Sequence, residues 1–268
     1  MRLSEISIYP IKSLGQLPLA RSVVEGRGLR HDRRWMLVDM AGRFLTQREH
    51  PQMARVSIEV EGAQIHVSVP GAERIGIQMN PESSDELTVT VWGSTVAARP
   101  YSPEISGWFS TVLGMECRLV VMPETSKRPV NPNYAVDADD EVSFADGYPF
   151  LLIGERSLED LNSRLERPVE MRRFRPNLVA DTSEPFEEDR WRKIRIGTTI
   201  FHVVKPCARC VLTTVDPDRG VIDGNEPLRT LATYRKSERG VLFGQNLIAE
   251  NPGGVINVGD EVEVLESA

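Results

Sequence analysis

Cysteine is scarce in this sequence, and a long apolar run is missing. Three cysteines in 268 residues cannot form a disulfide framework, and their scarcity suits a reducing compartment. No stretch approaches the ~18 consecutive apolar residues of a membrane span, and the chain does not begin with a basic segment followed by an apolar one. These absences predict a cytoplasmic protein with no membrane partner.

The sequence also has no excess of basic residues. Its formal net charge is −7 and its pI is about 5.3, which argues against a nucleic-acid partner but leaves room for a local basic pocket. With 268 residues, of which 40% are hydrophobic, the chain can bury a sizeable core in one large or two small domains. Disorder is therefore excluded as its dominant state.

The first hundred residues have the pattern of short β-strands. Glu61-Gly62-Ala63 predicts a hairpin turn between two of them. Helical spacing of five apolar residues between Ile105 and Leu113 predicts a helix over 103–114. Short strands at close intervals predict a small barrel or sandwich. The expected strands lie within residues 1–10, 34–38, 56–60, 65–69 and 87–92.

The second half combines strands with a few helices. A long loop is expected over 123–140, which is rich in Pro, Asn and Asp. Ser157 is predicted to cap a helix whose buried stripe is Leu158, Leu161 and Leu165. Another short helix is expected over 228–235, and strands are expected at 178–179, 194–196, 201–204, 211–215 and 255–265. The predicted fold class is mostly β with α+β elements.

The segment Cys207-Ala208-Arg209-Cys210 is the most informative local feature. Neighbouring cations, here Lys205 and Arg209, favour the thiolate, which is the nucleophilic and metal-binding form. A structural zinc site would need two more ligands, for which only Cys117 and His202 are evident. A thioredoxin-like pair would open a helix, whereas residues 211–215 are strand-like. Ordinary buried cysteines and a single thiolate ligand to a metal cofactor are the other interpretations.

Three basic clusters have the composition of anion sites. Residues 12–15 combine a lysine, a serine and a glycine turn, and residues 32–35 and 172–177 are rich in arginine. Each cluster alone is also explained by solvated surface charge. No Walker or G-x-G-x-x-G motif is present, so nucleotide binding has no support. The aspartates Asp146, Asp216 and Asp218 are also explained by turns.

Residues 207–218, with the sequence CARCVLTTVDPD, closely resemble the signature of MOSC-domain proteins, named for the C-terminal domain of molybdenum cofactor sulfurase. The resemblance covers nearly the whole chain, and its motifs occur in the family's order. Its nearest branch is that of the amidoxime-reducing molybdoenzymes. The other motifs that carry it lie at residues 9–13, 31–37, 144–146, 149–152, 174–177 and 243–246.

This resemblance implies a MOSC N-terminal β-barrel domain over residues 1–115 and a MOSC β-barrel domain that binds the molybdenum cofactor over 116–268. Cys210 would be the molybdenum ligand, Cys207 would lie nearby without coordinating, and Asp146 would lie close to the metal. A soft thiolate and scattered cations suit this phosphorylated molybdopterin cofactor. The residues that would hold the pterin and its phosphate are Lys12, Ser13, Arg33, Arg175, Asn177 and Arg209.

The implied function is a molybdenum-dependent oxidoreductase that reduces small N-hydroxylated compounds such as amidoximes, hydroxylamines and N-hydroxylated bases. Its first residues are expected to form a barrel strand, whereas animal members begin with a membrane-anchoring segment. Its three cysteines leave no iron–sulfur centre, so a separate ferredoxin, cytochrome b5-like protein or flavoprotein reductase is expected to supply electrons. Ala208 stands where some relatives have serine. The alternative function is a carrier of the cofactor, or of persulfide sulfur on Cys210, without turnover.

Overall fold

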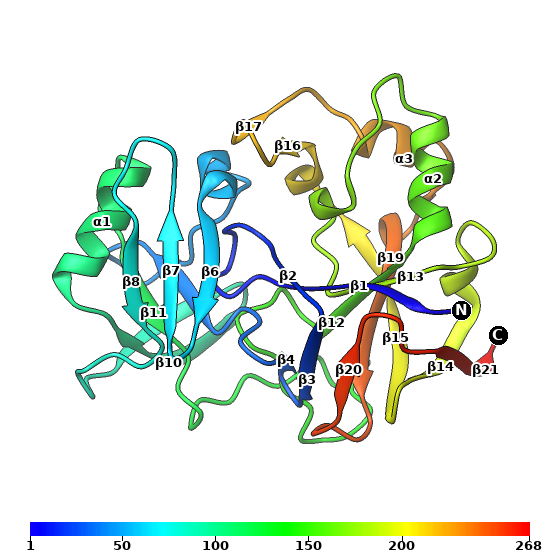
Figure 1. The fold of residues 1–268 in the computed structure, drawn as a ribbon, viewed down its shortest axis with the longest axis horizontal. Coiled ribbons are helices and arrows are strands. Elements are labelled where there is room, and N and C mark those ends of the chain that lie inside the picture. Colours follow the sequence, from blue (N-terminus) through cyan, green and yellow to red (C-terminus); the bar gives the residue numbers. More distant parts are fainter.

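The computed structural model describes residues 1–268 as a mostly β protein with three α-helices, which confirms the predicted fold class. Figure 1 shows two bodies of sheet side by side, with α1 (Pro103–Leu113) on one and α2 (Glu155–Ser163) and α3 (Leu228–Tyr234) on the other. No helix has the length and apolarity needed to cross a bilayer.

The larger body is built on a nine-stranded sheet. Its only parallel pairing joins β12 to β13. Phe150 and Phe201 meet edge to face in its core, with ring centroids 5.2 Å apart. In spatial order, the strands are β2 (Leu17–Leu19), β1 (Leu3–Ile8), β13 (Leu178–Ala180), β12 (Phe150–Gly154), β19 (Gly240–Ala249), β15 (Thr199–Arg209), β14 (Trp191–Ile196) and β21 (Val262–Ser267), with β18 (Lys236–Ser237) beside β19.

Two small sheets accompany this large one. One consists of β20 (Val255–Asn257), β3 (Arg21–Glu25) and β4 (Gly28–Leu29), and the other of β16 (Val215–Asp216) and β17 (Val221–Ile222). The turn between β16 and β17 confirms the predicted one, because Asp216 accepts hydrogen bonds from the backbone amides of Asp218 and Arg219.

The smaller body contains two sheets and α1. Ser102 caps α1 by accepting a bond from the Ile105 amide, and Gly114, with φ of 70°, ends it, as the predicted helix requires. The predicted hairpin around Gly62 is confirmed between β6 and β7. In order, the sheets are β5 (Trp35–Val38), β11 (Arg118–Val121), β10 (Ser94–Pro100) and β9 (Leu87–Val91), and β6 (Ser57–Glu61), β7 (Gln64–Ser68) and β8 (Ile75–Gln78).

The chain crosses between the two bodies more than once. Leu3 in β1 pairs with Ala180, and Val23 in β3 pairs with Val255, so the first strands lie with the later half. Conversely, β11 pairs with β5 in the smaller body. The division of the sequence after residue 115 stays a prediction. Within residues 9–35, Ile11 bridges to Trp35 at the start of β5, whereas β2 pairs with β1 and β3 pairs with β20 in the larger body.

Two local predictions were wrong. Helix α2 begins at Glu155 with Gly154 as its N-cap, and Ser157 is fully buried, donating instead to the Glu188 carboxylate. The stripe of leucines does pack into the core beneath α2. Residues 211–214 form a 3₁₀-helix rather than a strand. The hydroxyls of Thr213 and Thr214 bond back to carbonyls three residues earlier, which favours a turn over a strand.

Gly244 in β19 lies within residues 243–246, one of the motifs that carry the resemblance to the family. Its φ is 82°, and a Cβ there would lie 2.7 Å from Ile153 Cγ1 and 2.9 Å from the Leu152 carbonyl oxygen.

We expect Gly244→Ala to lower the free energy of unfolding by about 3 kcal/mol, because the cost of the left-handed backbone adds to the cost of overpacking. Gly62→Ala is the matched control, with φ of 59° and nothing within 4 Å. Equal losses in urea unfolding would contradict the packing argument.

Candidate functional site

A cavity of about 120 Å³ lies at the junction of the two bodies. All eight residues predicted from the sequence line it, although they come from five separate segments. Their individual roles stay predictions, but their convergence on one cavity is a structural finding. The predicted residues are Lys12, Ser13, Arg33, Asp146, Arg175, Asn177, Arg209 and Cys210.

One end of the cavity is organised around Asp146 and Cys210. Arg48 bridges them: its Nε lies 3.3 Å from Cys210 Sγ and its Nη2 3.1 Å from Asp146 Oδ2. The ammonium of Lys12 donates to Asp146 Oδ1 at 2.6 Å and to the Phe144 carbonyl at 2.7 Å. Asp146 thus holds Lys12 and Arg48 together, and Arg48 in turn reaches the sulfur predicted to bind metal.

Two pKa values at this end are lowered, that of Asp146 by neighbouring cations and that of Lys12 by burial. Partial desolvation at the cavity wall would by itself raise the pKa of Asp146, but the charges of Lys12 and Arg48 outweigh it and hold that pKa well below its usual range. Burial lowers the pKa of Lys12 to about 8, although Asp146 acts in the opposite direction. Asp146 is therefore ionised at neutral pH, and Lys12 titrates unusually close to it.

The sulfur of Cys207 contacts a different arginine, Arg209. Arg209 Nη1 lies 3.0 Å from Cys207 Sγ, and its Nη2 donates to the Phe174 carbonyl at 2.6 Å. Its Nε is buried with no hydrogen-bond partner. Cys207 and Cys210 line the same cavity but contact different guanidinium groups. The assignment of Cys210 as the coordinating sulfur and Cys207 as the non-coordinating one stays a prediction.

The other end of the cavity is a stack of cations on an aromatic ring. The guanidinium carbons of Arg33 and Arg175 lie 4.6 and 4.0 Å from the centre of the Tyr9 ring. The fully buried Asp32 holds Arg33 at 2.6 Å, and Arg33 also donates to Asn177 Oδ1 at 3.2 Å. Arg175 donates from Nη1 to a backbone carbonyl, while its Nη2 is buried without a partner. Burial lowers the pKa of Arg175 to about 10.

Backbone strain is concentrated at the same place. Six residues other than glycine have positive φ, and four of them are at this site: Ser13 (66°), Arg33 (50°), Arg175 (56°) and Trp92 (53°). Side chains larger than glycine adopt this conformation at a cost, which the surrounding structure must offset. It recurs in three of the residues predicted to bind the cofactor, so the surrounding structure imposes their orientation.

Three site residues were missed from the sequence. Arg48 stands alone between predicted elements, and Trp92 lies in a stretch typical of a strand, so neither has a local signal. The indole nitrogen of Trp92 donates to Asp146 Oδ1 at 3.1 Å. Arg128, within the predicted long loop, is buried and donates to the carbonyls of Ser143, Ala145 and Asp146. It thereby fixes the backbone that presents Asp146.

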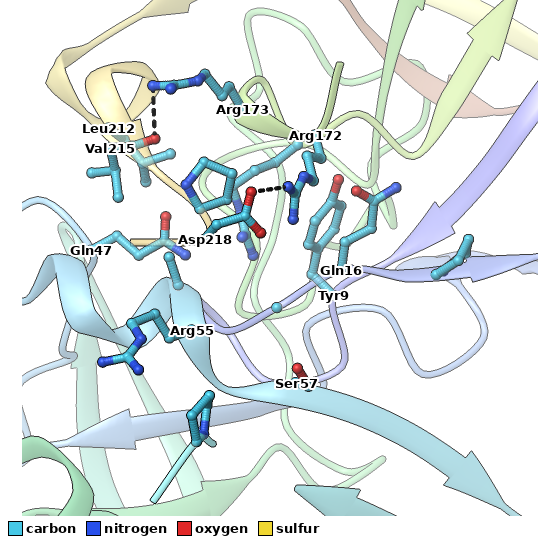
Figure 2. Close-up of a pocket in the computed structure, with 16 residues that line it drawn as sticks. Tyr9, Gln16, Gln47, Arg55, Ser57, Arg172, Arg173, Leu212, Val215 and Asp218 are labelled. Carbon is cyan, nitrogen blue, oxygen red and sulfur yellow. Dashed lines mark hydrogen bonds and ion pairs between the residues drawn. The ribbon is translucent and has the colours of Figure 1, made fainter. Parts of the chain in front are cut away.

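A larger cavity of about 460 Å³ adjoins the first one and shares Arg175 and Leu212 with it. Figure 2 shows Arg55 and Gln47 on one side and Arg172 and Arg173 on the other. Arg172 pairs with Asp218 at 2.6 Å, and Arg173 donates to the Val215 carbonyl at 3.2 Å. The two cavities together extend the basic lining beyond the cysteines.

The side chains present fit a phosphorylated pterin that carries molybdenum. Five cations and a single carboxylate line the first cavity: Lys12, Arg33, Arg48, Arg175 and Arg209 against Asp146. The buried, unpartnered nitrogens of Arg175 and Arg209 are donors that an anionic ligand would satisfy. No group of three or more His, Cys, Asp or Glu is arranged to hold a metal ion, so the zinc interpretation lacks its ligands. One soft sulfur ligand suits a metal whose other ligands come from the cofactor.

Comparisons with known proteins cover almost the entire chain. Residues 1–116 match the MOSC N-terminal beta barrel domain, and residues 139–263 match the MOSC domain. The chain is 36% identical to mitochondrial amidoxime-reducing component 1 of Mus musculus and 34% identical to that of Homo sapiens, over 98% of this chain and 82% of each relative. It is 35% identical to mitochondrial amidoxime reducing component 2 of Rattus norvegicus, over 97% of this chain and 82% of that relative.

Burial and the charge of Asp146 shift the pKa of Lys12 in opposite directions, which gives a measurable prediction. Asp146→Asn removes the charge that raises the Lys12 pKa but leaves the burial that lowers it, so this pKa falls below about 8. NMR titration of labelled lysine side chains resolves it, because the chain has only five lysines. In the wild type, folding is increasingly favoured as pH rises from about 8 towards 10.5, since only the unfolded chain keeps the proton there. A Lys12 pKa unchanged by Asp146→Asn would contradict the coupling.

Proposed function

The chain belongs to the MOSC-domain family that includes the amidoxime-reducing components, and from this premise we propose that it is a molybdenum-cofactor-dependent reductase of small N-hydroxylated compounds. The observation that carries the proposal is the convergence of Cys210, Asp146 and five cations on one cavity. An acidic protein that gathers cations around a single sulfur is suited to hold an anionic metal cofactor.

In this proposal, Cys210 Sγ binds the molybdenum, and the guanidinium of Arg48 orients that sulfur through its 3.3 Å contact. The phosphate and pterin are held by Lys12, Ser13, Arg33, Arg175, Asn177 and Arg209. When bound, the cofactor supplies the two-electron redox chemistry that a polypeptide lacks. The protein contributes position, charge and protons.

Reduction of an N–OH group to N–H consumes two electrons and two protons and releases water. Asp146 is well placed to relay these protons, since 60% of its side chain is exposed and it lies 2.6 Å from Lys12 Nζ. With its pKa held low, Asp146 alone is a poor acid. Lys12, with a pKa of about 8, holds the proton that Asp146 accepts and passes on near neutral pH.

The electrons come, in this proposal, from a separate redox protein of the ferredoxin, cytochrome b5-like or flavoprotein reductase class. Two of the three cysteines line the cavity, and Cys117 is buried in the core of the smaller body. The cysteines are therefore not placed to hold an iron–sulfur cluster. We propose that the partnership operates in the cytoplasm.

Metal loading tests the cofactor. Protein expressed with ample molybdate should contain near-stoichiometric molybdenum by elemental mass spectrometry and fluorescent oxidised pterin. Cys210→Ser should lose the metal, whereas the matched Cys207→Ser should keep it together with most of the activity. The reverse pattern would assign the wrong sulfur. Absence of molybdenum, with a persulfide on Cys210, would replace the reductase with a sulfur carrier.

Asp146→Asn tests the proton relay. We expect this variant to fold and keep its molybdenum but to lose turnover of an amidoxime by about 100-fold or more, because removal of a positioned proton-transfer group typically costs that much. The assay uses a chemical electron donor, so that docking of a redox partner does not enter. Unchanged turnover in the loaded variant would eliminate this role.

A further inference from the structure

Trp92 occupies an unusual position for a large apolar side chain. It lies in the turn between β9 and β10 of the smaller body, where its φ is 53° and 45% of its surface is exposed. It belongs to none of the buried core clusters, although its neighbour Val91 does. A bulky residue with left-handed backbone and little burial is costly and contributes little to stability.

Three contacts nevertheless fix the indole, two of them with residues that line the cavity. Its nitrogen donates to Asp146 Oδ1 at 3.1 Å. The guanidinium carbon of Arg48 lies 4.6 Å from the ring centre, and the Phe44 ring lies at 5.1 Å with a tilt of 52°. Since Arg48 also contacts Cys210 Sγ at 3.3 Å, the exposed ring lies beside the two residues assigned to the reaction.

We propose that Trp92 is a substrate-binding residue: its ring is the platform on which a flat, conjugated part of the substrate stacks. The inference rests on the proposed function and adds a preference within it, for aryl amidoximes and planar N-hydroxylated bases over saturated analogues. Aromatic pairs gain binding energy beyond the area that they bury, and a rigid indole fixed by Arg48 and Asp146 loses little entropy on binding. The same hydrogen bond places the stacked substrate beside the proton relay.

Two substrates that differ only in the flatness of one ring test this platform. Benzamidoxime and cyclohexanecarboxamidoxime share the reacting group, and the loaded holoenzyme is assayed with a chemical electron donor. Trp92→Leu should raise KM for benzamidoxime about tenfold and change KM for the saturated compound less than about twofold. Trp92→Phe keeps a flat ring and should restore most of the preference. A loss of kcat without a change in the KM ratio would show that Trp92 acts only by holding Asp146, and would overturn the proposal.

Fluorescence separates this inference from the proposed function, since it needs no turnover. Benzamidoxime should quench the emission of the wild type and of the control Trp108→Phe, which removes the indole of α1 in the smaller body. The quenching should disappear in Trp92→Phe. Quenching that persists in Trp92→Phe, or is absent from the wild type, overturns the platform. Quenching that depends on Trp92 in a protein that reduces neither amidoxime upholds the platform and refutes the reductase.

Discussion

The ion pair between Lys12 and Asp146 is the interaction on which the cavity depends. Lys12 is almost fully buried, and an ammonium so placed requires a partner charge. That partner also receives hydrogen bonds from Arg48 and Trp92, while Arg128 holds its backbone carbonyl. This one carboxylate therefore holds an ammonium, a guanidinium and an indole at the end of the cavity that contains Cys210. The carboxylate that partners the buried ammonium is therefore also the group that we propose relays protons.

Cations dominate the lining of the cavity. The chain as a whole is acidic, at −7, yet five cations lie around a single acid. Burial lowers the pKa values of Lys12 and Arg175, whereas Asp32 and Asp146 act against burial and raise the pKa values of Arg33 and Arg48. Three residues of the same lining also have strained backbones. An anion with several oxygen acceptors would offset the repulsion, so binding energy and folding energy are coupled here.

The elements and site residues that could be predicted from the sequence were mainly those determined by neighbouring residues. Ser102 and Gly114 bound α1 because caps act within one turn, and the hairpin at Gly62 is equally local. The eight cavity residues were found only through motifs resembling a family, since their segments are far apart. Arg48 and Trp92 were missed because they belong to no motif and contact Asp146 from distant parts of the sequence. The prediction of Ser157 as a helix cap was wrong because its hydroxyl is buried and bonds to the distant Glu188. The prediction of a strand at residues 211–214 was wrong because the threonine hydroxyls bond to nearby backbone carbonyls and favour a turn.

The course of the first strand has a consequence for modularity. Strand β1 lies inside the large sheet between β2 and β13, and the chain then carries Lys12, Ser13 and Arg33 along the junction before it enters the smaller body. A polypeptide divided after residue 115 would leave the later half with an open sheet edge at β13 and half a cavity. An exchange of either half between relatives would therefore have to preserve both the pairing of β1 with β13 and the fit of the residues that line the cavity.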